Sequence, residues 1–434
     1  MTWNVSDLLK GEERQAILEE LEKKVNQFAN RDITTPDPED VKDMIEQTEE
    51  ISELQTRLYA HTYLQHAVDV TDSEHNAKLK ELESRFTEHA NKLRFFTHWF
   101  KNLEEEEAQT YIESDTLQTY RYYLEKLRKD KPYTQSEEVE EAITYKDDAV
   151  RGLSKVYDLI TTNYEYEWDG ETITRDELLK KTKDENPETR KKAYETLLQK
   201  YDDDSDVLTE IYRNIVTDWI NEGLKIRNYQ SPIHIRNHGN DVQNESVESL
   251  LDVTQDNTDI IQEYFELKKE INNAKGATYD NERYHVYAPY EGKPEKEYTY
   301  EESQDIILNV FKKFHDDMYK AAKKVMDKDH IHPYPKKGKQ GGAFCYPASP
   351  DHTPYVFLNH TDDLNSLFTF IHECGHAVHG ELQRKQTHKN YGTPTTLAET
   401  ASVFAEKLLQ NHLLKKSDDK DEKIGTNTTQ YNNE

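Results

Sequence analysis

The chain has 434 residues and a mass of 51.2 kDa, which suits roughly two or three domains around a large core. Its 86 acidic and 56 basic residues give a formal net charge of −30, spread along the chain. A surface of this sign repels nucleic acid and anionic membranes, so we expect neither as a partner.

The first residues, MTWNVSDLLKGEERQ, have neither the basic segment nor the apolar run of a signal peptide. No stretch of the chain stays apolar for long enough to span a bilayer. The two cysteines, Cys345 and Cys374, are too few for a disulfide framework. These features predict a cytoplasmic protein.

Scarce glycine and proline, with long stretches of Glu, Lys, Leu and Gln, favour a mainly α, multi-helical fold. Residues 1–190 read as successive amphipathic helices and form a predicted N-terminal domain. Aromatic and aliphatic stripes at helical spacing are typical of core packing rather than of ligand sites. Two such stripes stand out: Leu18, Leu21, Val25 and Phe28, and Leu93, Phe96, Trp99 and Phe100.

Residues 165–175, YEYEWDGETIT, alternate around an Asp-Gly pair, which predicts a small β-hairpin. It lies near the boundary between the N-terminal domain and a second predicted domain, 191–414. Helices are expected from about 175 to 228 and from 247 to 273. Two apolar runs between 339 and 359 flank a Pro-rich turn and predict an antiparallel strand pair. Residues 415–434 are polar, and we expect them to form a loosely ordered tail.

The segment 370–379, FIHECGHAVH, carries the chemistry. On a helix, His372 and His376 share a face, so two imidazole nitrogens can bind one Zn²⁺. Glu373 stands one position further round, where it would act as the general base and then deliver the proton to the leaving amine. Cys374 projects away from that face and is expected to be a small core residue.

A catalytic zinc normally takes three protein ligands, and the helix predicted over 395–406, TTLAETASVFAE, offers the third. Glu399, Ser402 and Glu406 share one of its faces. Because most of the segment is otherwise apolar, we expect its carboxylate to be buried, and a buried carboxylate needs a cation. We predict Glu399 as the ligand. His379 and Glu406 are candidates for orienting the imidazoles by hydrogen bonds.

Two other histidine pairs compete for a metal: His234 with His238, and His330 with His332. Neither pair has a glutamate in the base position or a packed helix, so we expect neither to bind metal. A further alternative is that HExxH arose by accident in a purely structural helical protein. A metal assay that finds no stoichiometric zinc would favour that alternative.

These motifs resemble peptidase family M3, the thimet-type oligopeptidases, and within it the oligoendopeptidase F branch. The family pattern is HExGHxxH, then a glutamate ligand in an E-x-x-S helix, then a second glutamate seven positions on. Residues 336–344, KKGKQGGAF, resemble the family's G-K-x-x-GAF strand, and 355–361, YVFLNHT, resemble the strand before the zinc helix. The positions of this sequence that resemble the family's zinc motifs are His372, Glu373, Gly375, His376, His379, Glu399, Ser402 and Glu406.

The resemblance implies an almost all-helical, zincin-like fold with one Zn²⁺ on the floor of a deep channel. It implies cleavage of short, unstructured peptides in the cytoplasm. An extended peptide could pair with a strand edge formed by Gly341, Gly342, Ala343 and Phe344, where the glycines allow close approach. An ordinary structural hairpin is the alternative for this segment.

Family members continue well beyond the third-ligand helix, where further helices close the channel and a loop binds the oxyanion. The resemblance therefore implies that this chain is truncated after that helix. The alternative function is a catalytically weak or inactive relative that still binds zinc or peptide. The sequence leaves the oligomeric state and the cleavage preference open.

Overall fold

The computed structural model describes residues 3–34, 36–274, 279, 282–286, 288–289 and 296–433, and it is mainly helical, as predicted. The helices of the first half are α1 (Arg14–Ala29), α2 (Pro38–Val68), α3 (Ser73–Asn102), α4 (Glu105–Ile112), α5 (Arg121–Asp130), α6 (Glu137–Thr162), α7 (Arg175–Lys181), α8 (Pro187–Asp203) and α9 (Ser205–Ile220). Those of the second half are α10 (Pro232–Gly239), α11 (Asn244–Asp256), α12 (Thr258–Ala274), α13 (Tyr300–Phe314), α14 (Asp316–Asp327), α15 (Leu364–Gln383), α16 (Thr395–Lys416) and α17 (Lys420–Asn433).

Short helical turns and strands complete the described structure. The turns are η1 (Ser6–Leu9), η2 (Asp115–Tyr120), η3 (Lys131–Tyr133), the π-helical η4 (Asn221–Ile226), η5 (Arg283–His285) and η6 (His388–Asn390). The strands are β1 (Tyr166–Trp168), β2 (Glu171–Ile173), β3 (Ile331–His332), β4 (Phe344–Tyr346) and β5 (Tyr355–Phe357).

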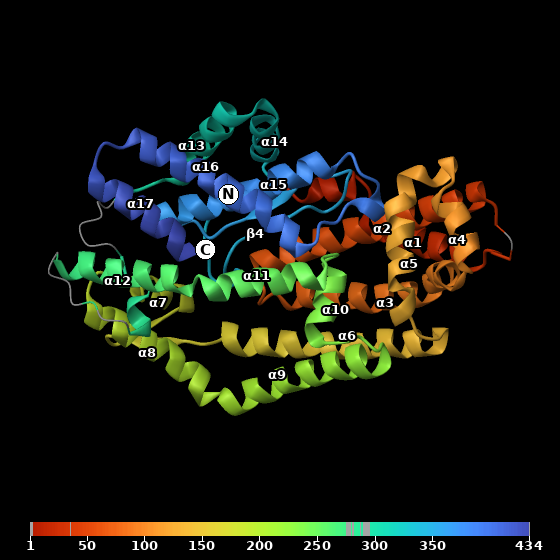
Figure 1. The fold of residues 1–434 in the computed structure, drawn as a ribbon, viewed down its shortest axis with the longest axis horizontal. Helices are drawn as coiled ribbons and strands as arrows, with labels where there is room; N and C mark the ends of the chain where they lie inside the picture. Colours follow the sequence, from red (N-terminus) through yellow and green to blue (C-terminus); the bar gives the residue numbers. More distant parts are fainter. Residues whose placement is uncertain are drawn as a thin grey trace.

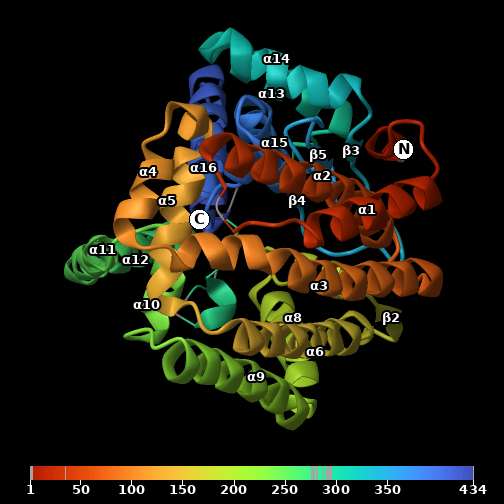
Figure 2. The same ribbon diagram turned by 90° about the vertical axis from the view of Figure 1, so that its right-hand side faces the viewer.

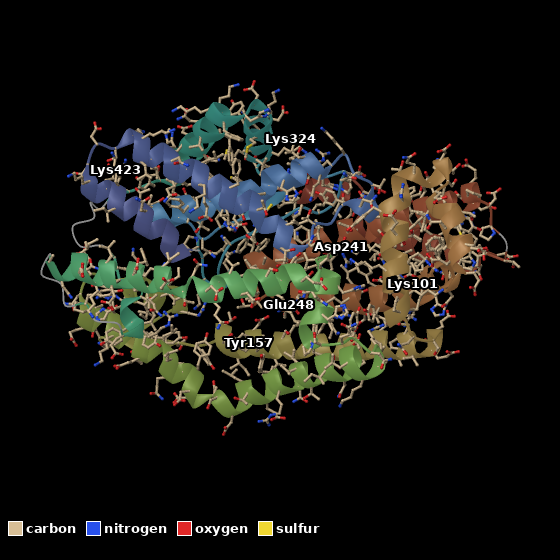
Figure 3. All side chains as sticks on the ribbon, in the orientation of Figure 1. Lys101, Tyr157, Asp241, Glu248, Lys324 and Lys423 are labelled. Atoms are coloured by element: carbon tan, nitrogen blue, oxygen red, sulfur yellow. The ribbon has the colours of Figure 1, made fainter. Side chains whose placement is uncertain are left out.

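Two groups of helices lie on opposite sides of the molecule, which Figures 1 and 2 show from perpendicular directions. The helices α13 to α17 lie toward one side, and α6, α8 and α9 lie along the other. The pair Lys324 and Glu381, 2.7 Å apart, joins α14 to α15, and Lys324 is labelled in Figure 3. No helix in the described part of the chain is both long enough and apolar enough to cross a membrane.

The first helices pack around their own core. Both predicted stripes contribute to it: Leu18, Leu21, Val25 and Phe28 are buried on α1, and Phe96 and Phe100 on α3. Leu93 and Trp99 are partly buried against this core. The periodicity was informative because each helix covers the core with one stripe and presents its charged residues to water.

The predicted hairpin is confirmed as β1 paired antiparallel with β2. Its turn residues, Asp169 and Gly170, have φ of 52° and 89°, which the Asp-Gly pair adopts easily in a tight hairpin turn. Tyr166 and Trp168 form a small core with α7 and α8. This hairpin packs on α8, and none of its residues belongs to the candidate site described below.

A three-stranded sheet of order β3-β5-β4 lies beside α15. The predicted pair is confirmed: β4 and β5 are antiparallel, with Cys345 opposite Val356. The strand β3, which runs parallel to β5, was not predicted, because two residues are too short to show strand periodicity. The sheet and helices α13 to α16 share a second large core that includes Val356, Phe368 and Ile371.

The N-terminal residues pack against this sheet rather than only against their own helices. Trp3 meets His332, Tyr355 and Phe357 with ring centroids 5.6–5.9 Å apart, and α2 contributes to the same apolar cluster. Figure 2 shows the N-terminus beside β3 and β5. The division into domains 1–190 and 191–414 stays a prediction. The contacts between the N-terminal residues and the sheet join these two predicted domains.

The prediction of a loosely ordered tail was wrong for residues 415–433. Helix α16 runs to Lys416, and Lys420–Asn433 forms α17, which packs on α15 and α16. Asp419 caps α17 by accepting the backbone N–H of Glu422 at 2.8 Å, and Thr426 is buried. Polar composition misled the prediction because tertiary contacts, rather than intrinsic propensity, stabilise most helices in proteins.

Candidate metal centre

Two helices that pack unusually closely carry the centre, and a glycine makes this possible. Gly375 lies on α15 against α16. A Cβ added there would lie 2.7 Å from the carbonyl oxygen of Ala401 and 2.7 Å from Cα of Ser402. Because real Cβ atoms do not approach backbone so closely, only glycine permits this separation. The close packing brings the first turns of α16 within reach of the histidines on α15.

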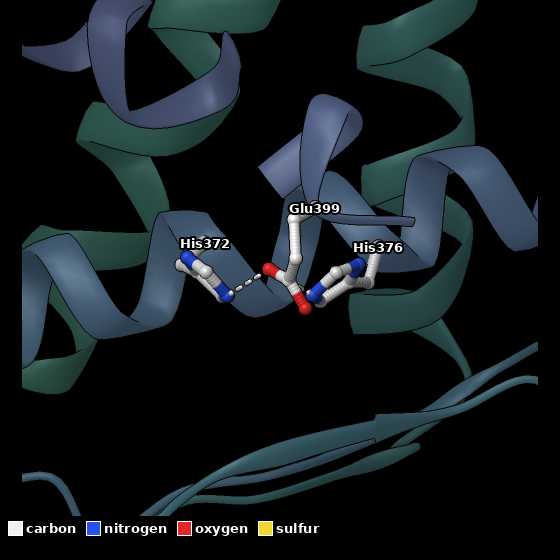
Figure 4. Close-up of side chains that lie close together, drawn as sticks. All are labelled: His372, His376 and Glu399. Carbon is white, nitrogen blue, oxygen red and sulfur yellow. Dashed lines mark ion pairs between the residues drawn. The ribbon is translucent and has the colours of Figure 1, made fainter. Parts of the chain in front are cut away.

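Side chains from the two helices converge at this contact, as Figure 4 shows. An oxygen of Glu399 lies 3.3 Å from Nε2 of His372 and 3.5 Å from Nε2 of His376. The donor atoms of the three residues all lie within 4.8 Å of one another. Ligands held 2.0–2.1 Å from a tetrahedral Zn²⁺ are about 3.3 Å apart, so the two distances and the N,N,O donor set fit this ion.

Hydrogen bonds fix two of these three donors. Oε1 of Glu406, whose side chain is 6% exposed, lies 2.6 Å from Nδ1 of His372. A proton on Nδ1 makes that contact a hydrogen bond and leaves the lone pair on Nε2, the nitrogen that faces Glu399. The hydroxyl of Ser402 donates to the Glu399 carboxylate at 2.8 Å. Both partners come from the same face of α16.

The pKa shifts follow from burial and these neighbours. Burial lowers the pKa of His372, but the hydrogen bond with Glu406 and the charge of the nearby glutamates outweigh it, so the net pKa is raised. Burial lowers the pKa of His376, while the charge of Glu399 acts in the opposite direction. The two imidazoles are therefore not equivalent, because within the described part of the chain only His372 has a carboxylate on its second nitrogen.

Glu373 is buried beside the two histidines, with 6% of its surface exposed. Burial raises the pKa of Glu373 to about 7, and the charges of Glu399 and Glu406 act in the same direction. His372 and a hydrogen bond with the backbone of Cys345 in β4 oppose this rise. A carboxyl group poised near neutrality is well matched to accepting and returning a proton.

One prediction about this region, the burial of Glu399, was wrong, and another, the role of His379, is not tested. Glu399 was expected to be buried, but its side chain is 51% exposed, because the first turn of α16 faces solvent and Leu397 there is 58% exposed. His379 hydrogen-bonds Gln383 at 2.8 Å, and no hydrogen bond to His372 or His376 is found among the described residues. Its role in orienting the imidazoles stays a prediction. Cys374 is buried, as expected.

The competing histidine pairs lie elsewhere. His234 and His238 stand on α10, a helix that was not predicted, and His238 lies 2.8 Å from Asp130. His330 is buried in the segment that leads into β3 and contacts Asp7 at 3.1 Å. Within the described residues, no group of three possible metal ligands includes either pair.

Among the described residues, two further acidic groups have the donor atoms for a cation, but a lysine already pairs with each. Lys10 lies 3.0 Å from Glu53 and 3.3 Å from Asp351, in the group that also contains His388. Lys146 pairs with all three carboxylates of the other group, which are Asp147, Asp218 and Glu222. Both groups are ion-pair networks.

The predicted peptide-binding segment leads into β4. Gly341 and Gly342 are exposed, Ala343 and Phe344 are half-buried, and Gly342 has a φ of 79°, which favours glycine. The strand β4 is at the edge of the sheet, and its backbone contacts Glu373. The segment is therefore next to the candidate base, while its binding role stays a prediction.

Sequence reasoning noted Gly375 only as part of a motif and missed what it does. A glycine inside an otherwise strong helical pattern was the available signal, because it costs helix stability and so points to close packing. Gln383, the partner of His379, carried no signal.

Family models match most of the chain. Residues 181–433, more than half of it, match the model of peptidase family M3. Residues 85–163 match a model described as oligopeptidase F.

Relatives and solved structures agree with these matches. The chain is 24% identical over 379 residues to oligopeptidase PepF of Bacillus subtilis, covering 85% of this chain but 55% of that protein. It is 24% identical over 430 residues to an oligoendopeptidase F homolog of Borreliella burgdorferi, covering 96% of this chain and 71% of that protein. The chain thus spans little more than half the length of PepF.

The fold is shared with a putative peptidase from Chlamydophila abortus, at a TM-score of 0.72 and 22% identity, over 100% of this chain and 73% of that one. It is also shared with a putative oligoendopeptidase F from Bacillus anthracis, at a TM-score of 0.73 and 20% identity, over 92% of this chain and 71% of that one.

Proposed function

Because this chain belongs to peptidase family M3, we propose that it is a zinc-dependent endopeptidase that hydrolyses short, unstructured peptides. The observation that carries the proposal is the convergence of two imidazoles and one carboxylate within 4.8 Å, with Glu373 on the same helix as the imidazoles. Relatives named oligopeptidase and oligoendopeptidase support peptides as the substrate class.

His372, His376 and Glu399 would hold one Zn²⁺ per chain. The ion would polarise the scissile carbonyl and make the attacking water more acidic. Hydrogen bonds from neighbouring side chains orient these donors. Glu406 accepts from Nδ1 of His372 and so leaves the lone pair on Nε2, and Ser402 donates to the carboxylate of Glu399.

Glu373 would serve as general base and then as general acid. Its carboxylate accepts a proton from the attacking water and returns it to the amine that leaves when the C–N bond breaks. Burial beside β4 supports this role, because a buried carboxyl group takes up a proton more readily than an exposed one. The edge of β4 would align the substrate beside Glu373 by backbone hydrogen bonds.

Metal removal and one substitution test the mechanism together. A chelator should abolish hydrolysis of a quenched fluorogenic peptide, and added Zn²⁺ should restore it. Glu373→Gln should lower kcat by about 10²–10⁴-fold while leaving bound zinc stoichiometric. Glu381→Gln is the matched control, because that carboxylate lies on the same helix but pairs with Lys324 and Arg384. Activity that survives complete metal removal would refute the mechanism, and loss of zinc from Glu373→Gln would mean that its role is misassigned.

The same sample separates this function from its alternative. A protein that binds zinc and peptide stoichiometrically but shows no turnover would be the inactive relative that the sequence also allows. The deep channel and the cytoplasmic location stay predictions, which a peptide-bound structure and cell fractionation would test.

A further inference from the structure

In the backbone segment that leads into β4, some peptide groups are hydrogen-bonded and others are not. Among the described residues, the peptide groups of Gly341 and Ala343 make no hydrogen bond, although their neighbours do. Gln340 donates its backbone N–H to Ala67 of α2 at 3.0 Å. Unpaired backbone groups beside a candidate catalytic base are what an extended substrate could use.

One side chain bridges this stretch. Nδ2 of Asn359, two residues after β5, donates to the carbonyl oxygens of Gln340 at 3.0 Å and Gly342 at 2.9 Å. Both N–H bonds of the amide are thereby used, and they span the two glycines. A primary amide can hold two carbonyls in this way, whereas an aspartate in its place has no hydrogen to donate.

A buried lysine anchors the start of the same stretch. Lys339 is 8% exposed, and its Nζ donates to the carbonyl oxygens of Tyr334 at 2.8 Å, His332 at 3.3 Å and Leu358. All three ammonium hydrogens are therefore engaged with the ends of β3 and β5. Since Asn359 follows Leu358 directly, both side chains tie the glycine segment to the end of β5.

We propose that Asn359 is a positioning residue that holds Gln340–Gly342 in place, so that Gly341 and Ala343 present their peptide groups to an extended peptide substrate. The proposal rests on the proposed function, and it assigns no contact between Asn359 and the substrate itself. Holding a flexible glycine segment in advance reduces the entropy lost on binding, so the gain belongs to substrate affinity rather than to the chemical step.

Kinetics of two variants test this role. Asn359→Ala removes the amide, and Asn359→Asp keeps its shape but has no donor. Both should raise KM for a quenched peptide by about tenfold or more while kcat and bound zinc stay within about twofold. Asn411→Ala is the matched control, because the amide of the exposed Asn411 donates to the backbone carbonyl of Lys407 on the same helix, α16, so this variant should leave KM unchanged. An unchanged KM in both Asn359 variants would overturn the proposal.

Two further measurements keep the result distinct from misfolding and from failure of the proposed function. Hydrogen exchange of the 338–346 peptide in the free protein should accelerate in both variants, with other core peptides unchanged. Replacing single substrate amides by esters should weaken binding to the wild type at one position and have a smaller effect in Asn359→Ala. If the wild type hydrolyses nothing, peptide binding replaces KM. Unchanged exchange together with an undiminished ester effect would then overturn the proposal by itself.

Discussion

At the scale of single residues, the centre depends on a histidine whose two nitrogens have different partners. His372 faces Glu399 with Nε2 and Glu406 with Nδ1, whereas His376 has no carboxylate on Nδ1 within the described structure. The second oxygen of Glu406 is buried and has no hydrogen-bond partner among the described residues. A proton on Nδ1 of His372 stabilises a negative charge on the Glu406 carboxylate. That charge in turn makes Nε2 a better electron-pair donor to a cation.

We therefore expect Glu406→Gln to weaken zinc binding by about 10–100-fold, because the amide orients His372 without the negative charge. Competition against a fluorescent chelator measures the change. Glu53→Gln provides the control, since Glu53 also pairs with a histidine, His388 at 3.1 Å, outside the centre. An unchanged zinc Kd in Glu406→Gln would mean that the pair serves folding alone.

The sequence could predict which residues meet, but not how far each is exposed. The i, i+4 spacing of the histidines and the face shared by Glu399 and Glu406 are properties of a single helix, so they were readable in advance. Exposure depends on what covers the helix. Glu406 is 6% exposed and Glu399 51%, although they stand seven residues apart on one face.

At the scale of elements, the separation of α15 and α16 sets the geometry of the centre, and Gly375 sets the separation. Any side chain there would meet the backbone of Ala401 and Ser402, which cannot move without shifting the helix that carries Glu399. The strain would be shared between the two helices, because interiors are packed too densely to absorb an extra methyl group.

Gly375→Ala should therefore destabilise the protein by about 1–3 kcal/mol, despite the better helix propensity of alanine. It should also raise the zinc Kd. Thermal unfolding and a zinc titration measure the two effects. Gly152→Ala on α6 is the matched control: a Cβ there would meet no described atom within 4 Å outside the neighbouring backbone of its own helix, so this variant should gain about 0.5–1 kcal/mol. Equal stability changes in the two variants would contradict the close-packing argument.

Elements with strong periodicity were predictable, and those made by tertiary contact were not. The hairpin at 166–173 and the pair β4–β5 had turn signals in the sequence. The strand β3 has two residues, and α17 has polar composition, so contacts with neighbouring elements, rather than local sequence, stabilise each of them. Helix α10 begins with Ser231 and Pro232, a capping signal that sequence reasoning passed over in favour of the histidines.

At the scale of the whole molecule, the chain's first residues pack against the sheet that lies beside the candidate centre. Asp7 of η1 pairs with His330 at 3.1 Å, accepts a hydrogen bond from the hydroxyl of Tyr355, and lies 3.6 Å from Lys328. Burial alone would raise the pKa of Asp7, but the hydrogen bonds with His330 and Tyr355 and the charges of His330 and Lys328 lower it to about 2. The lowered pKa means that folding favours the ionised carboxylate.

This preference predicts how stability depends on pH. A carboxyl group with a folded pKa near 2 and an unfolded value of 3.8 contributes fully above about pH 5, and the contribution is lost as pH falls through the two values. Asp7→Asn should therefore lower the free energy of unfolding at pH 7 by about 1–2 kcal/mol, allowing for solvent screening of a partly exposed group. The difference from the wild type should shrink between pH 5 and pH 3 in urea titrations, because the unfolded state protonates the aspartate in this range while the folded state still keeps it ionised.

Asp327→Asn is the comparison for that series. Asp327 is 58% exposed, and in the part of the chain that the structure describes it pairs only with Lys323 of the same helix, so its loss should cost about 0.3–0.5 kcal/mol. If Asp7→Asn costs no more than Asp327→Asn at pH 7, or if its cost does not fall with pH, the carboxylate does not join the N-terminus to the sheet. A large, pH-dependent cost that also weakens peptide binding would instead mean that the first ten residues support the centre at a distance, through β5 and the segment that Asn359 holds.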